Sequence, residues 1–377
     1  MGRQRWLATI AVGCAFAAVA TTGCRSPWPG GGHRPQVRMN EVQVLASHNS
    51  YHVEPEPTLV SALREVIGAE ADGLEYTHRP LADELDAGVR QIELDVFADP
   101  DGGRYAEPVL VPLLGLAPPD PALAGPGLKV FHIQEIDFRS TCPTFVDCLT
   151  QVRDWSDAHP RHLPITIQIE AKDGAIPDPG LGFVIPVPWT TATFAALESE
   201  IASVFEPDRV LTPAEVRGRH DTLADAVRAG RWPRLDRARG QVMFMLDDKG
   251  AKRDAYRTQV PDLEDRSVFV DVPQSDPDAA VTVVNDPVRD AARIRSLVEA
   301  GFIVRTRADA DTVQARTGDT SQRDAALASG AHFVSTDYVW PDDRFGTGYV
   351  VDLPGDTAAR CNPVNAPPQC PRADLSG

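Results

Sequence analysis

The sequence predicts a single α/β domain folded as a (β/α)8 barrel, the TIM-barrel architecture. Eight short β-branched or apolar runs, each bounded by turn residues, recur along residues 37–350, and stretches with helical periodicity separate several of them. The runs are mostly apolar on both faces, which is typical of strands buried in a parallel sheet. Strands that alternate with helices to a count of eight indicate a closed parallel barrel. A doubly wound open sheet is the alternative, but no glycine-rich phosphate loop follows the first run.

The predicted strands and helices follow one another along the chain. The strands lie at residues 42–46, 91–97, 128–133, 165–169, 241–246, 267–272, 301–306 and 332–336, and the helices at 144–159, 191–205, 287–300 and 321–329. Long loops rich in Pro, Gly and Asp follow the second and fourth strands, at residues 98–127 and 172–190. Because active sites of this fold are built from loops at the carboxyl ends of the strands, we expect these loops to border the site. Residues 351–377 are expected to form a C-terminal tail.

The N-terminal segment, residues 1–24, has the pattern of a signal peptide. Two arginines precede an apolar stretch at residues 6–20, and small residues lead to Cys24. Because Cys24 also permits a lipoprotein signal, we expect the protein to be secreted, or anchored to the cell exterior through a lipidated Cys24. Residues 25–36 are a Pro/Gly-rich linker. No other stretch has the roughly 18 apolar residues of a transmembrane segment.

The net charge is strongly negative. It is −17 for the whole chain and becomes −19 when the two arginines of the signal peptide are removed. Such a charge argues against nucleic acid or an anionic membrane as an electrostatic partner, and it suits a protein that binds a divalent cation. We expect the protein to be a monomer.

The cysteines indicate disulfide bonds. Outside the signal peptide the chain has Cys142, Cys148, Cys361 and Cys370. An even number at short spacings in an exported chain predicts two local disulfides, Cys142–Cys148 and Cys361–Cys370. A zinc cluster is the alternative, but no histidine lies at ligand spacing near either pair.

Polar side chains lie at or near the ends of the first four predicted strands. They are His48, Asn49, Glu93, Asp95, His132 and Glu170. Since residues two apart in a strand face the same side, Glu93 and Asp95 point together into the barrel or its mouth. Buried carboxylates need a partner, which is either a barrel arginine or a metal ion. Three carboxylates and one amide form an oxygen-rich set that prefers a hard cation, calcium more than zinc.

Two histidines are candidates for acid–base chemistry. A lone histidine is more often structural, but His48 and His132 flank the predicted metal set, each at the end of a strand. His52, His78 and His332 are expected to be structural.

Four motifs resemble the calcium-dependent phosphoinositide-specific phospholipase C family, in particular its compact bacterial members. They are SHNSYH (47–52), LADELDAGVRQIELDVF (81–97), FHIQE (131–135) and IQIEAK (167–172), with weaker support from FMLDDK (244–249), VRTRAD (304–309) and STDY (335–338). The resemblance implies that Asn49, Glu93, Asp95 and Glu170 bind Ca²⁺ and that His48 and His132 flank the phosphate. It implies cleavage of phosphatidylinositol to diacylglycerol and a cyclic inositol phosphate, through metal-assisted attack of the inositol 2-hydroxyl.

Four further residues are expected to contact the substrate, a phosphatidylinositol-type lipid at a membrane surface. They are Lys172, Lys249, Arg305 and Tyr338. Tyr338 would stack on the inositol ring, whereas Arg305 has the alternative of a salt bridge to Glu93 or Asp95. Eukaryotic members of the family place two lysines near the fifth strand, where FMLDDK offers only Lys249. Plain phosphatidylinositol is therefore the expected substrate.

Membrane contact is expected at the barrel rim. The apolar loop GFVIPVPW (182–189) offers Val184, Ile185 and Trp189, although the same loop is also compatible with a buried lid.

Two other functions remain open at this point. A glycerophosphodiester phosphodiesterase has a similar barrel and a similar acidic metal site, but that family usually has His-Arg-Gly after its first strand, where this chain has His48-Asn49-Ser50. A non-catalytic lipoprotein that binds inositol or a sugar phosphate is the second alternative.

Overall fold

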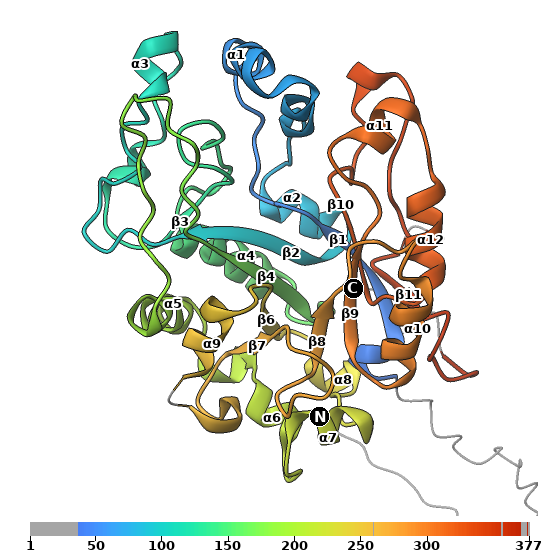
Figure 1. Cartoon of the computed structure of the whole chain (residues 1–377). Helices are drawn as coiled ribbons and strands as arrows, with labels where there is room; N and C mark the ends of the chain where they lie inside the picture. Colours follow the sequence, from blue (N-terminus) through green and yellow to red (C-terminus); the bar gives the residue numbers. More distant parts are fainter. Residues whose placement is uncertain (1–36, 259, 356, 371–374, 376–377) are drawn as a thin grey trace, which may run out of the picture. The chain divides into compact units, whose positions relative to one another are not determined.

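A computed structural model describes residues 37–258, 260–355, 357–370 and Leu375. The predicted signal peptide, Cys24 and the linker at residues 25–36 lie outside the described residues. The described residues belong to one compact unit, which Figure 1 shows in colours that follow the sequence. None of the helices in this part of the chain has the length and hydropathy that crossing a membrane requires.

Eight parallel strands form the barrel within the described residues. They are β1 (Val42–Ser47), β2 (Val89–Phe97), β4 (Ile165–Lys172), β6 (Val242–Leu246), β7 (Val268–Val270), β8 (Val281–Val283), β9 (Ile303–Arg307) and β10 (Phe333–Thr336). Their order is β7–β6–β4–β2–β1–β10–β9–β8. A parallel bridge between Asp271 and Val281 joins β7 to β8. The predicted α/β barrel is therefore confirmed.

The prediction that residues 128–133 form a parallel strand of the barrel was wrong. Only β3 (Lys129–Val130) is extended there, and it pairs antiparallel with the last two residues of β2. The backbone of this run also bonds to the segment before α4, through Val130 N–H to Pro143 O. Because these partners satisfy its backbone groups, the run does not join the parallel sheet, and His132 lies in the loop that follows. The barrel strand that the prediction missed is β8, which has only three residues.

Twelve α-helices and several shorter elements connect the strands in the described residues. The helices are α1 (Pro57–Ile67), α2 (Leu81–Asp86), α3 (Leu110–Leu114), α4 (Phe145–Ala158), α5 (Thr191–Val204), α6 (Pro213–Arg217), α7 (Leu223–Arg228), α8 (Leu235–Ala238), α9 (Ala251–Arg257), α10 (Ala291–Glu299), α11 (Val313–Thr317) and α12 (Ser321–Ser329). Short 3-10 helices lie at Met39–Glu41, Gly68–Leu74, Pro121–Ala124, Pro207–Arg209, Pro261–Leu263 and Asp343–Phe345, and β5 is Val210–Leu211. Four helices begin after a threonine whose hydroxyl accepts a backbone N–H, at Thr144, Thr190, Thr212 and Thr222. Such caps satisfy donors that a helix leaves free at its first turn.

The C-terminal tail is part of the sheet. Strand β11 (Ala359–Cys361) pairs antiparallel with the first half of β1. Both predicted disulfides are present, Cys142–Cys148 and Cys361–Cys370. The second disulfide therefore holds the residues after β11 next to the barrel wall.

The connections after the strands lie at one end of the barrel. Helices α1, α3 and α11 follow the carboxyl ends of β1, β2 and β9, and Figure 1 shows them on the side opposite α6 and α7. The end that carries α1, α3 and α11 is called the mouth below.

Candidate active site

The register of β2 against β4 brings the acidic residues together. Asp95 is paired with Glu170, and Glu93 is paired with Gln168. Because neighbouring strands lie about 5 Å apart, side chains at paired positions on one face are in contact. One carboxylate oxygen from each of Glu93, Asp95 and Glu170 lies within 4.8 Å of the others. The three carboxylates that the sequence analysis selected therefore form one cluster.

Asn49 lies at the carboxyl end of β1, beside this cluster. Its backbone has a φ of +45°, a left-handed conformation that asparagine tolerates better than most residues. The turn is fixed by Ser50, whose N–H donates to Glu93 O at 3.0 Å and whose hydroxyl accepts from Glu93 N–H at 2.9 Å. Asn49 Nδ2 donates to the Tyr76 hydroxyl at 3.0 Å, which leaves the amide oxygen available to a metal ion.

Glu93 forms a salt bridge with a buried arginine. Arg305 Nη2 lies 2.5 Å from Glu93 Oε2, and both side chains are almost fully buried. The guanidinium also donates to Asn285 and Ser335. These partners occupy Arg305 inside the barrel, so the geometry favours the salt bridge to Glu93 over the predicted contact with substrate.

The donors of the cluster suit a calcium ion. Asp95 is fully buried, and among the described residues the polar partner of its carboxylate is the Lys172 ammonium, 3.1 Å from Oδ2. Burial raises the pKa of Asp95 well above its usual value, and Lys172 only partly opposes this rise. A buried carboxylate is costly unless a cation binds it. With Glu93, Glu170 and the Asn49 amide oxygen it forms the hard oxygen set that calcium prefers.

Lys172 ends β4 and lies inside the cluster. Its Nζ is 3.1 Å from Asp95 Oδ2 and 3.2 Å from Glu170 Oε1. Burial lowers the pKa of Lys172, but attraction to Asp95 and Glu170 outweighs burial, so the pKa is raised and the ammonium stays charged. Of the four predicted substrate contacts, Lys172 and Arg305 contact predicted metal ligands: Lys172 pairs with Asp95 and Glu170, and Arg305 pairs with Glu93.

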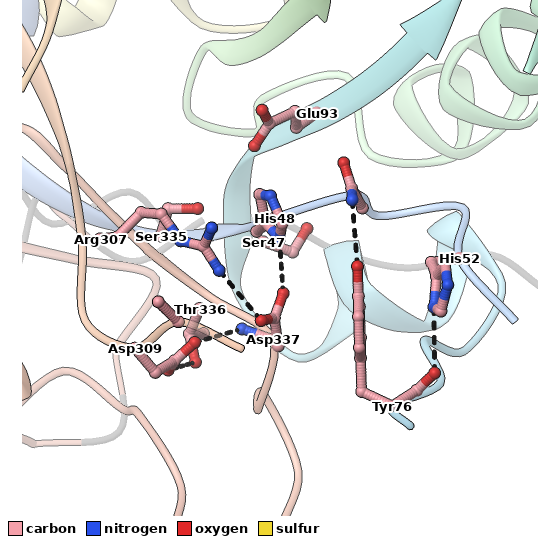
Figure 2. A network of polar contacts seen from close by, with 12 residues as sticks. Ser47, His48, His52, Tyr76, Glu93, Arg307, Asp309, Ser335, Thr336 and Asp337 are labelled. Atoms are coloured by element: carbon pink, nitrogen blue, oxygen red, sulfur yellow. Dashed lines mark hydrogen bonds and ion pairs between the residues drawn. The ribbon is translucent and has the colours of Figure 1, made fainter. Parts of the chain in front are cut away.

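His48 is oriented by a carboxylate from the other end of the chain. Its Nδ1 lies 2.6 Å from Asp337 Oδ1, and Arg307 Nη2 lies 3.1 Å from Asp337 Oδ2. Figure 2 shows Asp337 between His48 and Arg307. Burial and Arg307 lower the pKa of His48, against the attraction of Asp337. With Nδ1 bonded, Nε2 is the ring atom left for a substrate.

His132 is oriented in the same way, by a nearby carboxylate. Its Nδ1 lies 2.7 Å from Asp137 Oδ2, and His52 Nε2 lies 2.8 Å from the same oxygen. His52 is fully buried, bonds to Tyr76 O through Nδ1 at 3.0 Å, and stacks on the Tyr76 ring at 4.1 Å. Burial raises the pKa of Asp137, but His52 and His132 lower it more, so the carboxylate stays charged. The short separations are those of hydrogen bonds and leave no room for an ion between Asp137 and either ring.

Both catalytic candidates lie beside the acidic cluster. His48 and His132 each lower the pKa of Glu170 by electrostatic attraction, together with the larger effect of Lys172 and against the effect of burial. The negative charge of Glu93 in turn partly opposes the lowering of the His48 pKa by burial and Arg307. The two imidazoles therefore lie close enough to the carboxylate cluster to interact with it electrostatically.

Two of the predicted substrate contacts lie outside this centre. Tyr338 is buried, and its ring packs against Phe345 and Tyr349, so it does not offer a face to an inositol ring. Lys249 is exposed, and its Nζ lies 3.4 Å from Asp271. These placements favour structural or rim positions for both residues.

His78 and His332 have structural partners, as expected. His78 Nδ1 lies 2.5 Å from Glu84 Oε1, and His332 bonds to the backbone of Val304 and Asn40.

The sequence analysis missed several residues that complete the site. Asp337 and Asp137 orient the two histidines, Tyr76 holds Asn49, and Asp247 lies near Glu93. Burial and Glu93 raise the pKa of Asp247 to about 7, and Gln168 Nε2 donates to its carboxylate at 3.1 Å. The positions of Asp247 after β6 and Asp337 after β10 are the signal that could have selected them. Tyr76 and Asp137 follow no barrel strand, so their sequence gives no such signal.

Comparisons with known proteins agree with this geometry. Residues 37–363 match the family model of the Ca²⁺-dependent phosphoinositide phospholipases C. A search of curated proteins returned no match.

The structure resembles solved bacterial enzymes. The calcium-dependent phosphatidylinositol-specific phospholipase C of Streptomyces antibioticus is 20% identical, with a TM-score of 0.50 over 80% of this chain and 95% of that chain. The calcium-dependent phosphoinositol-specific phospholipase C of a Gram-negative Pseudomonas species is 17% identical, with a TM-score of 0.54 over 86% of this chain and 95% of that chain. The structure of its myo-inositol complex is 17% identical in sequence, with a TM-score of 0.53 over 86% of this chain and 96% of that chain. At these identities the likenesses establish the fold.

The family match covers most of the chain and the predicted site. The chain therefore belongs to the calcium-dependent phosphoinositide phospholipases C, phosphodiesterases that require Ca²⁺ and cleave phosphatidylinositol-type lipids.

Proposed function

We propose that the inositol 2-hydroxyl of phosphatidylinositol attacks the adjacent phosphorus at this site, which releases diacylglycerol and a cyclic inositol phosphate. The observations that support this proposal are two imidazoles that are each held by a carboxylate and that interact electrostatically with Glu170, together with the cluster of three carboxylates that includes Glu170. In-line displacement at phosphorus needs an acid for the leaving oxygen and positive charge near the phosphoryl oxygens.

The two histidines have different roles in this proposal. Asp137 holds Nδ1 of His132, so Nε2 is placed to give a proton to the diacylglycerol oxygen as its bond to phosphorus breaks. Asp337 holds Nδ1 of His48, so its Nε2 is placed to bond a phosphoryl oxygen. A carboxylate at the correct side of each ring fixes the ring orientation and stabilises the protonated form.

Asn49, Glu93, Asp95 and Glu170 would hold the calcium ion. Calcium, when bound, lowers the pKa of the 2-hydroxyl and offsets negative charge on the phosphoryl oxygens. A carboxylate of the cluster would accept the proton that the hydroxyl loses.

Plain phosphatidylinositol is the proposed substrate. Asp247 follows β6, where eukaryotic members of the family have lysines that hold ring phosphates. The next residue, Asp248, offers no binding site for a ring phosphate either, because its carboxylate accepts a hydrogen bond from Ala171 N–H and pairs with Lys252 at 2.5 Å. A carboxyl group at Asp247 can bond a ring hydroxyl, whereas it would repel a ring phosphate.

Exposed apolar side chains at the mouth would contact the lipid surface. Val66 on α1, Leu113 on α3, Ile185 in the loop after β4 and Val313 on α11 are each more than half exposed. Trp189, a predicted member of this surface, is instead buried and donates to Lys172 O at 3.1 Å. Such side chains supply apolar contact without positive charge, which suits a protein of net charge −17.

Export is also part of the proposal. Two disulfides support it, because such bonds persist in oxidising compartments. Mass spectrometry of the protein secreted by its host would test it, since either a chain that begins near residue 25 or a lipidated Cys24 is expected.

The catalytic proposal is tested with the purified protein and two substrates. Phosphatidylinositol should be cleaved in calcium and not in chelator, with a five-membered cyclic phosphate visible by phosphorus NMR. Phosphatidylinositol that carries a 2-O-methyl group should not be cleaved. Turnover of the methylated lipid, or turnover only of glycerophosphoinositol, would contradict the mechanism.

The lipid-surface proposal needs a second comparison. Ile185→Ser combined with Leu113→Ser should lower turnover of lipid in phosphatidylcholine vesicles. Turnover of short-chain phosphatidylinositol below its micelle concentration should stay unchanged, which makes the dispersed substrate the internal control. Equal losses on both substrates would show that the two side chains do not act through the lipid surface.

A further inference from the structure

The Lys172 ammonium lies where the carboxylate cluster would attract a cation. It is within 3.1 Å of Asp95 and 3.2 Å of Glu170, and its side chain is largely enclosed, with 22% exposed. Among the described residues, the Lys172 ammonium is the polar partner of the Asp95 carboxylate. The two carboxylates that Lys172 joins are two of the four predicted calcium ligands.

A calcium ion and this ammonium cannot both stay between Asp95 and Glu170. Calcium binds carboxylate oxygens at about 2.3–2.6 Å and accepts six to eight oxygen ligands, with no place for an ammonium among them. Two positive groups at this separation also repel each other strongly in a site shielded from water. The side chain of Lys172 is long, flexible and partly open to solvent, so it has a path toward the mouth.

We propose that Lys172 is an internal cation that holds Asp95 and Glu170 in the calcium-free enzyme, and that calcium binds by displacing its ammonium, so that this lysine limits the calcium affinity. The inference rests on the proposed calcium site. The displaced ammonium then lies beside that site, where it becomes free to contact the phosphate. Lys172 therefore couples calcium binding to the presence of a free cation at the mouth.

The chain offers a matched control. Lys252 also bridges two carboxylates, since its Nζ lies 2.5 Å from Asp248 and 3.4 Å from Asp173, and it is similarly enclosed, with 29% exposed. Neither of its partners is a predicted calcium ligand. Lys252→Met therefore removes the same charge from the same region without opening the site.

The test is calcium binding, measured without substrate. Wild-type, Lys172→Met, Lys172→Arg and Lys252→Met proteins are titrated with calcium chloride by isothermal titration calorimetry. One nearby charge typically changes the affinity of a site for a charged species by tenfold or more. Lys172→Met should therefore bind calcium at least about tenfold more tightly than wild type. Lys172→Arg, which keeps the charge, and Lys252→Met should bind it as wild type does.

Two further measurements keep the test informative if Lys172→Met is unstable without calcium. The variant can be prepared with calcium, and the release of calcium to a fluorescent chelator can be followed by stopped flow, where release at least about tenfold slower than in wild type is expected. Thermal denaturation should show a larger rise in Tm on adding calcium for Lys172→Met than for wild type.

Three outcomes would overturn the inference while the calcium site stands. They are unchanged or weaker binding by Lys172→Met, equal tightening by Lys252→Met, and equal tightening by Lys172→Arg. If wild type binds no calcium by any of these methods, the proposed calcium site itself is wrong, and the inference fails with it.

Discussion

Replacement of Asp137 by Asn tests how the protein prepares His132 for catalysis. Asp137 is fully buried and lies 2.7 Å from His132 Nδ1 and 2.8 Å from His52 Nε2. Asparagine has the same shape, but its amide carries no charge and presents an N–H to one of the two rings. The substitution therefore removes the charge-assisted bond to His132 and leaves the backbone bonds between Ile133 and Asp137 in place.

The size of the effect follows from that bond. A hydrogen bond to a charged group contributes about 1.5–3 kcal/mol, and each 1.36 kcal/mol is a factor of ten in rate. We therefore expect kcat on phosphatidylinositol to fall by about 10- to 150-fold, with the calcium affinity unchanged.

The assay is steady-state turnover on dispersed phosphatidylinositol between pH 5 and pH 9. His132→Ala should lower kcat by about 10²–10⁴ if His132 is the general acid. In the His132→Ala background, Asp137→Asn should cost little more, because Asp137 acts through His132. A further loss as large as that in wild type would refute this reasoning, as would a drop below about threefold in the single variant.

Three other predictions concern stability. Arg305→Met should lower the free energy of unfolding in chelator by about 3–5 kcal/mol, because it leaves Glu93 as a buried charge without its partner; a loss below about 1 kcal/mol in urea denaturation would contradict this. Burial lowers the pKa of His332 to about 4, so the histidine of the unfolded chain takes up a proton at a higher pH than that of the folded chain. The stability that neutral His332 contributes is therefore fully present above about pH 6.5 and is lost as the pH falls toward 4. The loss between pH 7 and pH 4.5 should be about 2 kcal/mol in urea denaturation, and it should disappear in His332→Gln. The same slope in both proteins would exclude His332 as the cause. Replacement of Cys142 and Cys148 together by Ser should cost about 2 kcal/mol, since the disulfide closes a short loop, and an unchanged Tm would argue against that bond.

Much of the acidic centre could be predicted because its determinants are local. Glu93 and Asp95 are two residues apart in a strand, so they face the same side whatever the rest of the fold does. His48 and Asn49 are adjacent at the end of a run that reads clearly as a strand. The disulfides were also predictable, because the two cysteines of each pair are only six or nine positions apart in the sequence.

The parts that were not predicted depend on contacts that local patterns do not encode. Strand β8 has three residues, too few for a periodic signal, and the run at residues 128–133 has strand character but finds partners other than the parallel sheet. Trp189 looked suited to a membrane surface, yet its indole is buried and bonds to the backbone of Lys172.

The sequence by itself selected the residues that we propose to hold calcium and the histidines that we propose to act beside them, because strand periodicity and the ends of strands are properties of short segments. Only the tertiary structure decided how those residues are held. Asp337 meets His48 across 289 residues, and Arg305 meets Glu93 across 212. Both contacts exist because barrel closure places β10 beside β1 and β9 beside β10. The physical reason is that the alternation of side chains along a strand is set by backbone geometry, whereas the pairing of distant strands is set by the packing of the whole barrel.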